Sequence, residues 1–231
     1  SYRRQVASGG VADKSLEGRV CVVTGAAQGF GYGIASGLAE AGGTVAVVDL
    51  NEEGAIEAAE HINSHAGRDR AFAVAADVSR EESVAAMVEQ ILAQCGGIDV
   101  LIANAGVLRA GSVKELSFRD WKLVTDVNYT GYFLCVKHTA PVMAQQNQAA
   151  PCGRWTDIIQ ISSKSGLEGS NRNAAYAGSK FGGIGLTQSF AKELVSDRIK
   201  ANSICPGNFF DGPLWSDPDN GLFVQYLRSG K

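Results

Sequence analysis

A tyrosine and a lysine stand one helical turn apart in the stretch AAYAGSKFGG, at Tyr176 and Lys180. Residues four apart share one face of a helix, so the phenol and the ammonium project into the same space. The positive charge favours the phenolate, which lets the tyrosine accept or return a proton. Ser163, in the preceding segment IQISSKSG, adds a hydroxyl for the same reacting oxygen. Taken alone, the spacing also fits an ordinary pair on a solvated helix.

A glycine-rich turn, TGAAQGFGYG, directly follows the apolar run RVCVV. Gly25, Gly29 and Gly31 let the backbone turn sharply and approach a ligand closely. The helix that follows directs its N–H groups and its dipole at this turn, an arrangement that suits a pyrophosphate. The spacing differs from the common G-x-G-x-x-G, so a plain strand-to-helix turn is the alternative.

Asp49 ends the second apolar run, TVAVVDL. A carboxylate at this place accepts the ribose hydroxyls of an adenosine and repels a 2′-phosphate. No Arg or Lys occurs between Gly25 and Gly33, or immediately after Asp49, to neutralise such a phosphate. The predicted cofactor is therefore NAD rather than NADP. Asp49 could also cap the next helix, and the two roles can coexist.

Short apolar runs alternate with longer helical patterns from Arg19 onward. Strands that are apolar throughout and separated by helices indicate a parallel sheet covered on both faces. The predicted fold class is α/β, a single doubly wound (Rossmann-type) parallel sheet with helices on both faces. The expected strands are RVCVVTG, TVAVVDL, AFAVAAD, IDVLIANAG, WTDIIQISS and IKANSICPG, and the expected helices include 52–66, 121–146 and 173–196.

Composition narrows the classes of function. The chain has 231 residues, 45% of them hydrophobic, and a formal net charge of −3. Without a basic stripe, nucleic acid and anionic membrane are not expected partners. No apolar run approaches the roughly 20 residues that span a bilayer. We expect a tail or linker at 1–15 and one domain at 16–231.

Cysteines and histidines suggest no metal site. The five cysteines are scattered and lack paired ligand spacing, so reduced thiols in the cytoplasm are expected: Cys21, Cys95, Cys135, Cys152 and Cys205. His61 and His65 lie four apart in a helical pattern. Without a third ligand nearby, a solvated helix face is the expectation.

Further motifs carry a family resemblance: Asp77–Val78, the NAG of 104–106, Asn128 in DVNYTG, and Pro206–Gly207. With TGAAQGFG and Y-x-x-x-K, they resemble the short-chain dehydrogenase/reductase family over residues 16–207. The resemblance implies that the catalytic residues are Asn128, Ser163, Tyr176 and Lys180. It implies that the cofactor is bound by Gly25, Gln28, Gly29, Phe30, Gly31, Asp49, Asp77, Val78, Asn104, Ala105, Gly106, Tyr176, Lys180, Pro206 and Gly207.

The family also implies roles and an assembly. Lys180 would bind the nicotinamide ribose, and Asn128 would position a water between Lys180 and solvent. A homotetramer or homodimer would bury helices 121–146 and 173–196. The segments GYFLC, IIQISSKSG and KFGGIGLTQS resemble the hexitol-phosphate branch, sorbitol-6-phosphate 2-dehydrogenase-like members in particular. Similar domains occur fused behind a sugar-phosphate aldolase.

The substrate would be a polyol or its phosphate, contacted by Ser163, Lys164, Arg172 and Tyr176, with Arg109 as a further cation. Ordinary solvated charge is the alternative for the cations. Residues 208–231 resemble the start of a substrate lid, with Phe209, Phe210, Leu214 and Trp215, whereas the helix and seventh strand that follow in the family are absent. Alternative functions are the same chemistry on another sugar, steroid or acyl ketone, or a non-catalytic NAD-binding regulator.

Overall fold

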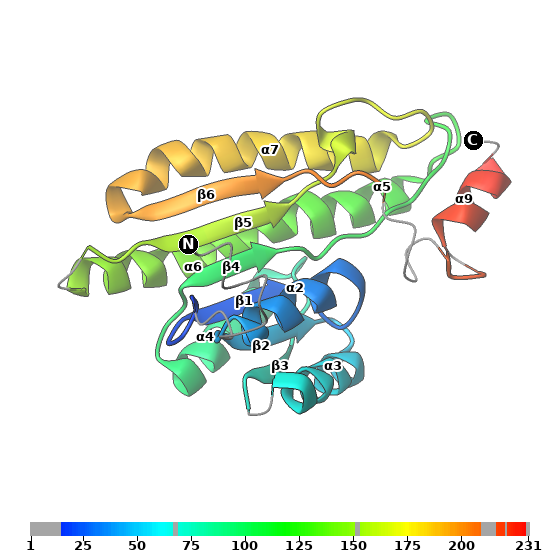
Figure 1. The fold of residues 1–231 in the computed structure, drawn as a ribbon. Helices are drawn as coiled ribbons and strands as arrows, with labels where there is room; N and C mark the ends of the chain where they lie inside the picture. Colours follow the sequence, from blue (N-terminus) through cyan, green and yellow to red (C-terminus); the bar gives the residue numbers. More distant parts are fainter. Residues whose placement is uncertain (1–14, 67–68, 151–152, 209–215, 220, 230–231) are drawn as a thin grey trace, which may run out of the picture.

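One six-stranded parallel sheet forms the centre of the molecule (Figure 1). The computed structural model describes residues 15–66, 69–150, 153–208, 216–219 and 221–229. The strand order is β3-β2-β1-β4-β5-β6, which confirms the predicted doubly wound sheet. The strands are β1 (Val20–Thr24), β2 (Thr44–Asp49), β3 (Ala71–Ala75), β4 (Val100–Ala103), β5 (Thr156–Ile161) and β6 (Ile199–Ile204).

Helices cover both faces of this sheet. Each face of the sheet has its own buried apolar cluster. One cluster packs α4, α6 and α7 against the sheet, and the other packs α2 and α3 against it. The central strands β1, β2 and β4 are buried on both sides, as their uninterrupted apolar runs predict, whereas the edge strands β3 and β6 are partly exposed. The helices are α2 (Gly29–Glu40), α3 (Glu52–Ala66), α4 (Glu81–Cys95), α5 (Phe118–Thr125), α6 (Gly131–Ala149), α7 (Ala174–Leu194) and α9 (Leu222–Ser229).

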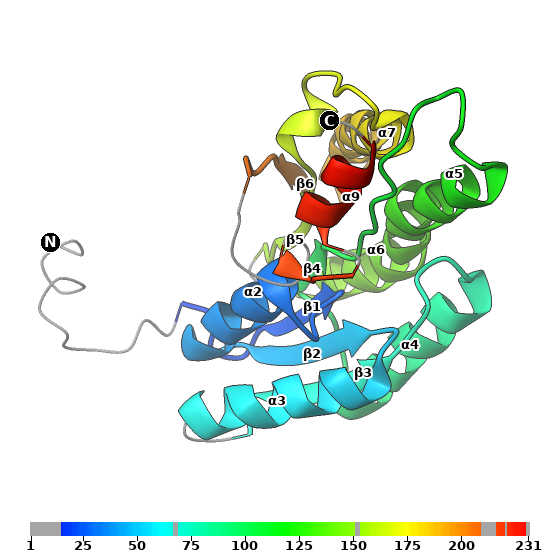
Figure 2. The ribbon, with the colours of Figure 1, turned by 90° about the vertical axis from the view of Figure 1, so that its right-hand side faces the viewer.

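The strand order reverses between β1 and β4. Strand β1 pairs with β2 on one side and with β4 on the other, so the connections that leave β1 and β4 diverge to opposite sides of the sheet. Ligands of such sheets bind outside the carboxyl ends of the strands at this reversal. Helix α9 lies beyond these ends (Figures 1 and 2). The Gln225 Oε1 atom accepts a hydrogen bond from Ala110 N at 3.3 Å, which ties α9 to the loop after β4.

The prediction of one continuous helix at 121–146 is wrong, because a π-helical segment interrupts it. It begins earlier, as α5, and passes through a five-residue π-helical segment, Asp126–Thr130, before α6. Inside that segment the Asn128 side chain accepts from Val107 N at 2.8 Å and donates to Val107 O at 2.9 Å. These two bonds hold the side chain inward. Such π-helical insertions are frequent at functional sites.

Helix α7 ends two residues before the predicted boundary, where a short 3₁₀ turn, Val195–Asp197, follows. Its glycines permit close packing at two positions. A Cβ at Gly183 would lie 1.9 Å from Gln160 Nε2, and one at Gly182 would lie 2.8 Å from the Tyr129 ring. Gly178 and Gly185 have nothing within 4 Å of an added Cβ, so they face open space.

Two further expectations concern residues across the chain. Cys21, Cys95, Cys135 and Cys205 are free, whereas Cys152 falls outside the described residues. Within the part of the chain that the structure describes, no helix combines the length and apolar character needed to cross a bilayer. The tail predicted at 1–15 falls, except for Ser15, outside the described residues.

Candidate active site

The glycine turn after β1 is as tight as its sequence predicts. Gly25 and Gly29 have φ angles of +65° and +59°, which L-residues with side chains rarely adopt. A Cβ at Gly31 would lie 2.1 Å from the Gly25 carbonyl oxygen, so the start of α2 presses directly on the turn. Gln28 and Phe30 are exposed beside it. The backbone at the N-terminus of α2 therefore forms a cradle that fits a pyrophosphate.

Asn104 holds this turn against the sheet. Its Nδ2 atom donates to the carbonyl oxygens of Thr24 and Gly25, both at 2.9 Å. The Thr24 hydroxyl in turn accepts from the backbone N–H groups of Asn104 and Ala105, each at 3.1 Å. The motif after β4 thus fixes the geometry of the turn after β1.

Asp49 lies at the rim of an open pocket. Its two carboxylate oxygens accept from Ala27 N and Asn51 N, each at 3.0 Å. Asn51, rather than Asp49, caps α3, because its Oδ1 atom accepts from Gly54 N at 3.2 Å. The pocket has a volume of about 540 Å³, and none of its lining residues is Lys or Arg: Ala27, Gln28, Tyr32, Asp49, Asn51, Gly54, Glu57, Ala58 and His61.

Of the residues that line this pocket, only Gln28 and Asp49 were predicted as cofactor-binding, and Tyr32 and His61 are among those that the sequence did not indicate. The Tyr32 hydroxyl hydrogen-bonds to His61 Nδ1, and the His61 and His65 rings lie 4.3 Å apart between centroids. Both histidines are exposed, as expected of a solvated helix face. Among the residues that the structure describes, no group of three or more His, Cys, Asp or Glu side chains could hold a metal ion. A tyrosine one turn into α2 gives no sign, in sequence alone, that it faces α3.

The segment after β3 lies at the same edge of the sheet. The Asp77 carboxylate accepts from Ser79 N at 2.9 Å and from the Ser79 hydroxyl at 2.6 Å. Val78 is buried against Gly131 at the start of α6, where an added Cβ would lie 2.9 Å from Val78 Cγ2. Val78 therefore packs against the start of α6, and the role of Asp77 and Val78 in binding the nucleotide stays a prediction.

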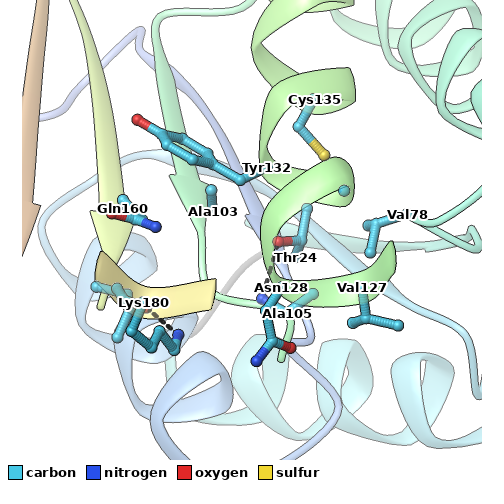
Figure 3. Close-up of a pocket in the computed structure, with 12 residues that line it drawn as sticks. Thr24, Val78, Ala103, Ala105, Val127, Asn128, Tyr132, Cys135, Gln160 and Lys180 are labelled. Carbon is cyan, nitrogen blue, oxygen red and sulfur yellow. Dashed lines mark hydrogen bonds between the residues drawn. The ribbon is translucent and has the colours of Figure 1, made fainter. Parts of the chain in front are cut away.

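Lys180 is the buried cation of the site. The residue is 5% exposed, and its Nζ atom donates to the Ile161 carbonyl at 2.8 Å. The same atom lies 5.6 Å from the centroid of the Tyr176 ring, which confirms that the predicted pair shares one face of α7. Burial lowers the pKa of Lys180 to about 8, and Coulomb interaction with Cys205 opposes this shift. Figure 3 shows Lys180 at a small cavity that Asn128 and Gln160 also line.

Ser163 lies at the start of the segment that joins β5 to α7, and Tyr176 lies just beyond its end. Ser163 Oγ accepts from Ser165 N at 3.1 Å, which leaves its hydrogen available to a substrate oxygen. The neighbouring Lys164 N donates to Pro206 O at 2.9 Å, so the segment after β6 is fastened to this turn, and Gly207 follows it. Tyr176 is half-buried in the first turn of α7. The structure thus gathers Ser163, Tyr176 and Lys180 at one strand end.

Asn128 approaches the same place from the π-helical segment. Besides its two bonds to Val107, its Nδ2 atom donates to Ser179 Oγ at 3.2 Å. A Cβ added to Gly106 would lie 3.4 Å from Asn128 Oδ1 and 3.7 Å from Lys180 Nζ. The exposed Gly106 therefore lies between these two side chains and solvent.

Cations surround the mouth of the site, but two of them face carboxylates. Arg172 lies 3.6 Å from Glu115, and Arg109 lies 3.6 Å from Asp120. Arg172 has a φ of +54°, and its carbonyl accepts from Gly111 N at 2.8 Å. Lys164 is exposed. The predicted lid residues Phe209, Phe210, Leu214 and Trp215 fall outside the described residues.

Comparison with known proteins places this geometry among enzymes. A family model described as short chain dehydrogenase matches residues 19–215. Sorbitol-6-phosphate 2-dehydrogenase of Escherichia coli (strain K12) is 36% identical over 208 residues, which are 90% of this chain and 76% of that protein. The 3-oxoacyl-acyl-carrier-protein reductase FabG of Chlamydia muridarum is 34% identical over 214 residues, 92% of this chain and 82% of that protein.

Solved structures show the same relationship. Sorbitol-6-phosphate 2-dehydrogenase SrlD from Erwinia amylovora superposes with a TM-score of 0.79 at 39% identity, covering 84% of this chain and 73% of that one. A xylitol dehydrogenase solved with NAD⁺ bound superposes with a TM-score of 0.77 at 34% identity, covering 83% of this chain and 71% of that one.

Proposed function

The chain belongs to the short-chain dehydrogenase family, and from this premise we propose that it is an NAD-dependent oxidoreductase that interconverts a secondary alcohol and a ketone. The observation that carries the proposal is the buried Lys180 ammonium beside the Tyr176 ring, at the strand end next to the glycine turn. A non-catalytic regulator would not need a tyrosine that a buried ammonium prepares to act as a base.

Each catalytic side chain has a defined task in this proposal. The glycine turn and Asp49 would hold NAD, which would supply the acceptor for the hydride of the carbinol carbon. Tyr176 takes the hydroxyl proton of the alcohol, because the neighbouring ammonium favours its phenolate. Ser163 donates a hydrogen bond to the same oxygen and holds it during the transfer. Asn128 keeps the π-helical segment against the loop after β4, beside Lys180. In the reverse direction Tyr176 returns the proton to the ketone oxygen.

Several features support NAD rather than NADP. The Asp49 carboxylate is fixed by two backbone N–H groups at the rim of the pocket, where it can accept ribose hydroxyls. Glu57 adds a second carboxylate to the lining, and no Lys or Arg lines it to pair with a 2′-phosphate. The xylitol dehydrogenase that superposes on this chain was solved with NAD⁺.

We assign a polyol or hexitol phosphate, such as sorbitol 6-phosphate, as the substrate. The resemblance to two sorbitol-6-phosphate 2-dehydrogenases supports this assignment. Lys164 and Arg172 would bind the phosphate, Arg172 by leaving its 3.6 Å contact with Glu115. A second candidate is an acyl ketone, favoured by the FabG relative and by two exposed apolar side chains in the loops that follow β4 and β5, Val113 and Leu167.

The proposal extends to assembly and location. Exposed aromatic side chains on the outer faces of α6 and α7, Phe133 and Phe181, support a homotetramer or homodimer that buries these helices. The free cysteines favour a reducing compartment, so we place the protein in the cytoplasm.

An absorbance assay for NADH tests the function. Sorbitol 6-phosphate, sorbitol, xylitol and an acetoacetyl thioester would be compared, the thioester in the reducing direction, each with both nicotinamide cofactors. We expect turnover of the phosphorylated polyol with NAD, and a raised KM for it alone in Lys164→Ala and Arg172→Ala. Equal rates on sorbitol and sorbitol 6-phosphate in all three proteins would refute the phosphate site. Activity confined to the thioester would favour the second candidate.

A further inference from the structure

We propose that Gln160 is a positioning residue for the active-site lysine: its buried side-chain amide fixes the position of α7 on the sheet and lines the small cavity that Lys180 also lines. This inference rests on the proposed function. The family resemblance implied roles for the other site residues but none for Gln160, which lies in the predicted strand of IIQISS.

Gln160 is a polar side chain in an apolar layer. It is 2% exposed on the side of β5 that faces α6 and α7, among residues such as Ile158 and Leu101. Burying an amide in such a place is unfavourable unless its polar atoms find partners. Its Oε1 atom accepts from the hydroxyls of Thr187, at 3.3 Å, and Ser203, at 3.1 Å. One oxygen thus links β5 to α7 and β6.

Hydroxyl groups surround the Gln160 oxygen and orient the side-chain amide. Burial raises the pKa of Tyr132 to about 12, so its hydroxyl keeps its proton. Tyr132 and Thr187 lie 3.0 Å apart between hydroxyl oxygens. Either of these two hydroxyls can be the donor, and the Thr187 hydroxyl also lies 3.0 Å from the Gly183 carbonyl, to which it can donate. The Ser203 hydroxyl donates to Gln160 Oε1 at 3.1 Å, so the Gln160 oxygen is an acceptor whichever way the Thr187 hydroxyl turns. The Nε2 group is therefore directed away from Thr187.

That Nε2 group rests on the backbone of α7. A Cβ at Gly183 would lie 1.9 Å from Gln160 Nε2, so only glycine allows the helix to approach this closely. Gly183 is less than one turn beyond Lys180. Two further contacts fasten the same turn: Lys180 Nζ donates to Ile161 O at 2.8 Å, and Ser162 Oγ donates to Lys180 O at 3.4 Å. Gln160, Ile161 and Ser162 thus hold one turn of α7 in register with the end of β5.

Gln160 also shares a cavity with Lys180. The cavity is small, about 10 Å³, which is roughly the room of one water. Its polar walls are Thr24, Asn128, Tyr132, Gln160 and Lys180 (Figure 3). The amide is part of the polar lining that this cavity offers to the Lys180 side chain, and an apolar side chain of the same size would make the lining less polar and deepen the desolvation of the ammonium. Among the described residues, the titratable groups that face the ammonium or line its cavity are Tyr176, on its own helix, Cys205, after β6, and Tyr132 and Cys135, on α6.

Replacing the amide by an apolar chain of similar length isolates its contribution. Gln160→Met should fold and keep the KM for the alcohol, but its kcat should fall by about tenfold, since small misplacements at an active site are costly. The rising limb of the kcat–pH profile for alcohol oxidation should move to higher pH, because a less stable ammonium supports the Tyr176 phenolate less. Thr187→Val, which removes one donor to the amide oxygen, should shift the limb in the same direction by less.

A second buried amide supplies the matched control. Asn147 is fully buried and donates to Thr156 Oγ1 at 3.0 Å, Asp197 O at 3.0 Å and Arg198 O at 3.1 Å, at the opposite end of β5. Asn147→Leu should lower the thermal midpoint and leave the pH profile unchanged. If Gln160→Met does the same, the positioning role is wrong and Gln160 is merely structural. Should Gln160→Met fail to fold, a Thr187→Val profile identical to wild type would overturn the inference.

A readout without turnover separates this inference from the proposed function. The titration of Lys180 can be followed as the pH dependence of unfolding that Lys180→Met removes. In Gln160→Met this titration should move to lower pH. A wild type that oxidises no alcohol would defeat the proposed function, while the inference would still be decided by this titration. An unmoved titration would overturn it.

Discussion

Lys180 combines a charge, near-complete burial and a catalytic neighbour. An ammonium taken out of water is unfavourable unless other groups replace its hydration. The Ile161 carbonyl and the face of the Tyr176 ring replace part of it. The remaining deficit lowers the pKa of Lys180 to about 8, mainly through burial. Free energy of folding is thus given up at this residue to place a positive charge beside a phenol.

That deficit should be measurable as a pH dependence of stability. Below about pH 8 Lys180 is protonated in both states, and the unfavourable burial of its charge is fully present. Between about 8 and the ordinary value of 10.5, the folded protein has released this proton while the unfolded chain retains it. Because the unfolded state then binds more protons, the free energy of unfolding rises with pH.

The rise should total about 3 kcal/mol relative to Lys180→Met. Urea denaturation at several pH values from neutral to 10.5 would measure it, with Lys114→Met, an exposed lysine, as the control for loss of charge. If the free energy of unfolding of the wild type, relative to that of Lys180→Met, stays constant or falls across this pH range, the assignment of Lys180 as a desolvated cation is contradicted.

Elements of structure bring these side chains together, and the sequence predicts the regular ones better than the irregular ones. Local patterns suffice for the strands, for the glycine turn, and for the i, i+4 pairing of Tyr176 with Lys180. The π-helical break depends on Asn128 finding the Val107 backbone 21 positions away, which no local pattern contains. The position of α7 on the sheet depends on the contact between the Gln160 side chain and Gly183. Both irregularities arise from tertiary contacts.

Helix α2 offers a matched pair of glycines for testing the turn. Gly31→Ala would place a Cβ 2.1 Å from the Gly25 carbonyl oxygen and 2.6 Å from Asn104 Nδ2. We expect it to lower stability by about 2 kcal/mol or more, and to weaken NADH binding, because backbone must move. Gly33→Ala meets nothing within 4 Å, so it should be neutral or stabilise the helix by up to about 1 kcal/mol.

Thermal unfolding and NADH fluorescence titration of both variants give the answer. Equal behaviour of Gly31→Ala and Gly33→Ala would mean that the start of α2 does not press on the turn. It would also remove the geometric argument for a pyrophosphate cradle at this position.

At the scale of the whole molecule, parallel order and strand reversal were predictable from alternating apolar runs and helices. The environment of the substrate mouth was not. Arg172 and Arg109 were expected as available cations, yet each faces a carboxylate, Glu115 and Asp120, brought near by the loop after β4. Sequence distance hides such pairings, since Arg172 and Glu115 are far apart along the chain.

The proposed homo-oligomer is tested by the outer faces of α6 and α7. Phe133 is 42% exposed and Phe181 is 45% exposed on the single chain. A lysine at either position should split the assembly, because burying an unpaired charge opposes association. Light scattering after size exclusion would report the mass. Ile56→Lys, at a position 44% exposed on α3 at the other face of the sheet, is the control and should leave the assembly intact. A wild type that is monomeric at micromolar concentration would refute the proposal.

The central claim is that Tyr176 transfers the proton while Lys180 supports its phenolate. The most direct measurement is the turnover number of Tyr176→Phe on the best alcohol substrate, with its NADH affinity determined in parallel by fluorescence. We predict that kcat falls by about 10²–10⁴-fold while NADH binding is retained, since only the hydroxyl is removed. A Tyr176→Phe protein that turns over near the wild-type rate would contradict the account.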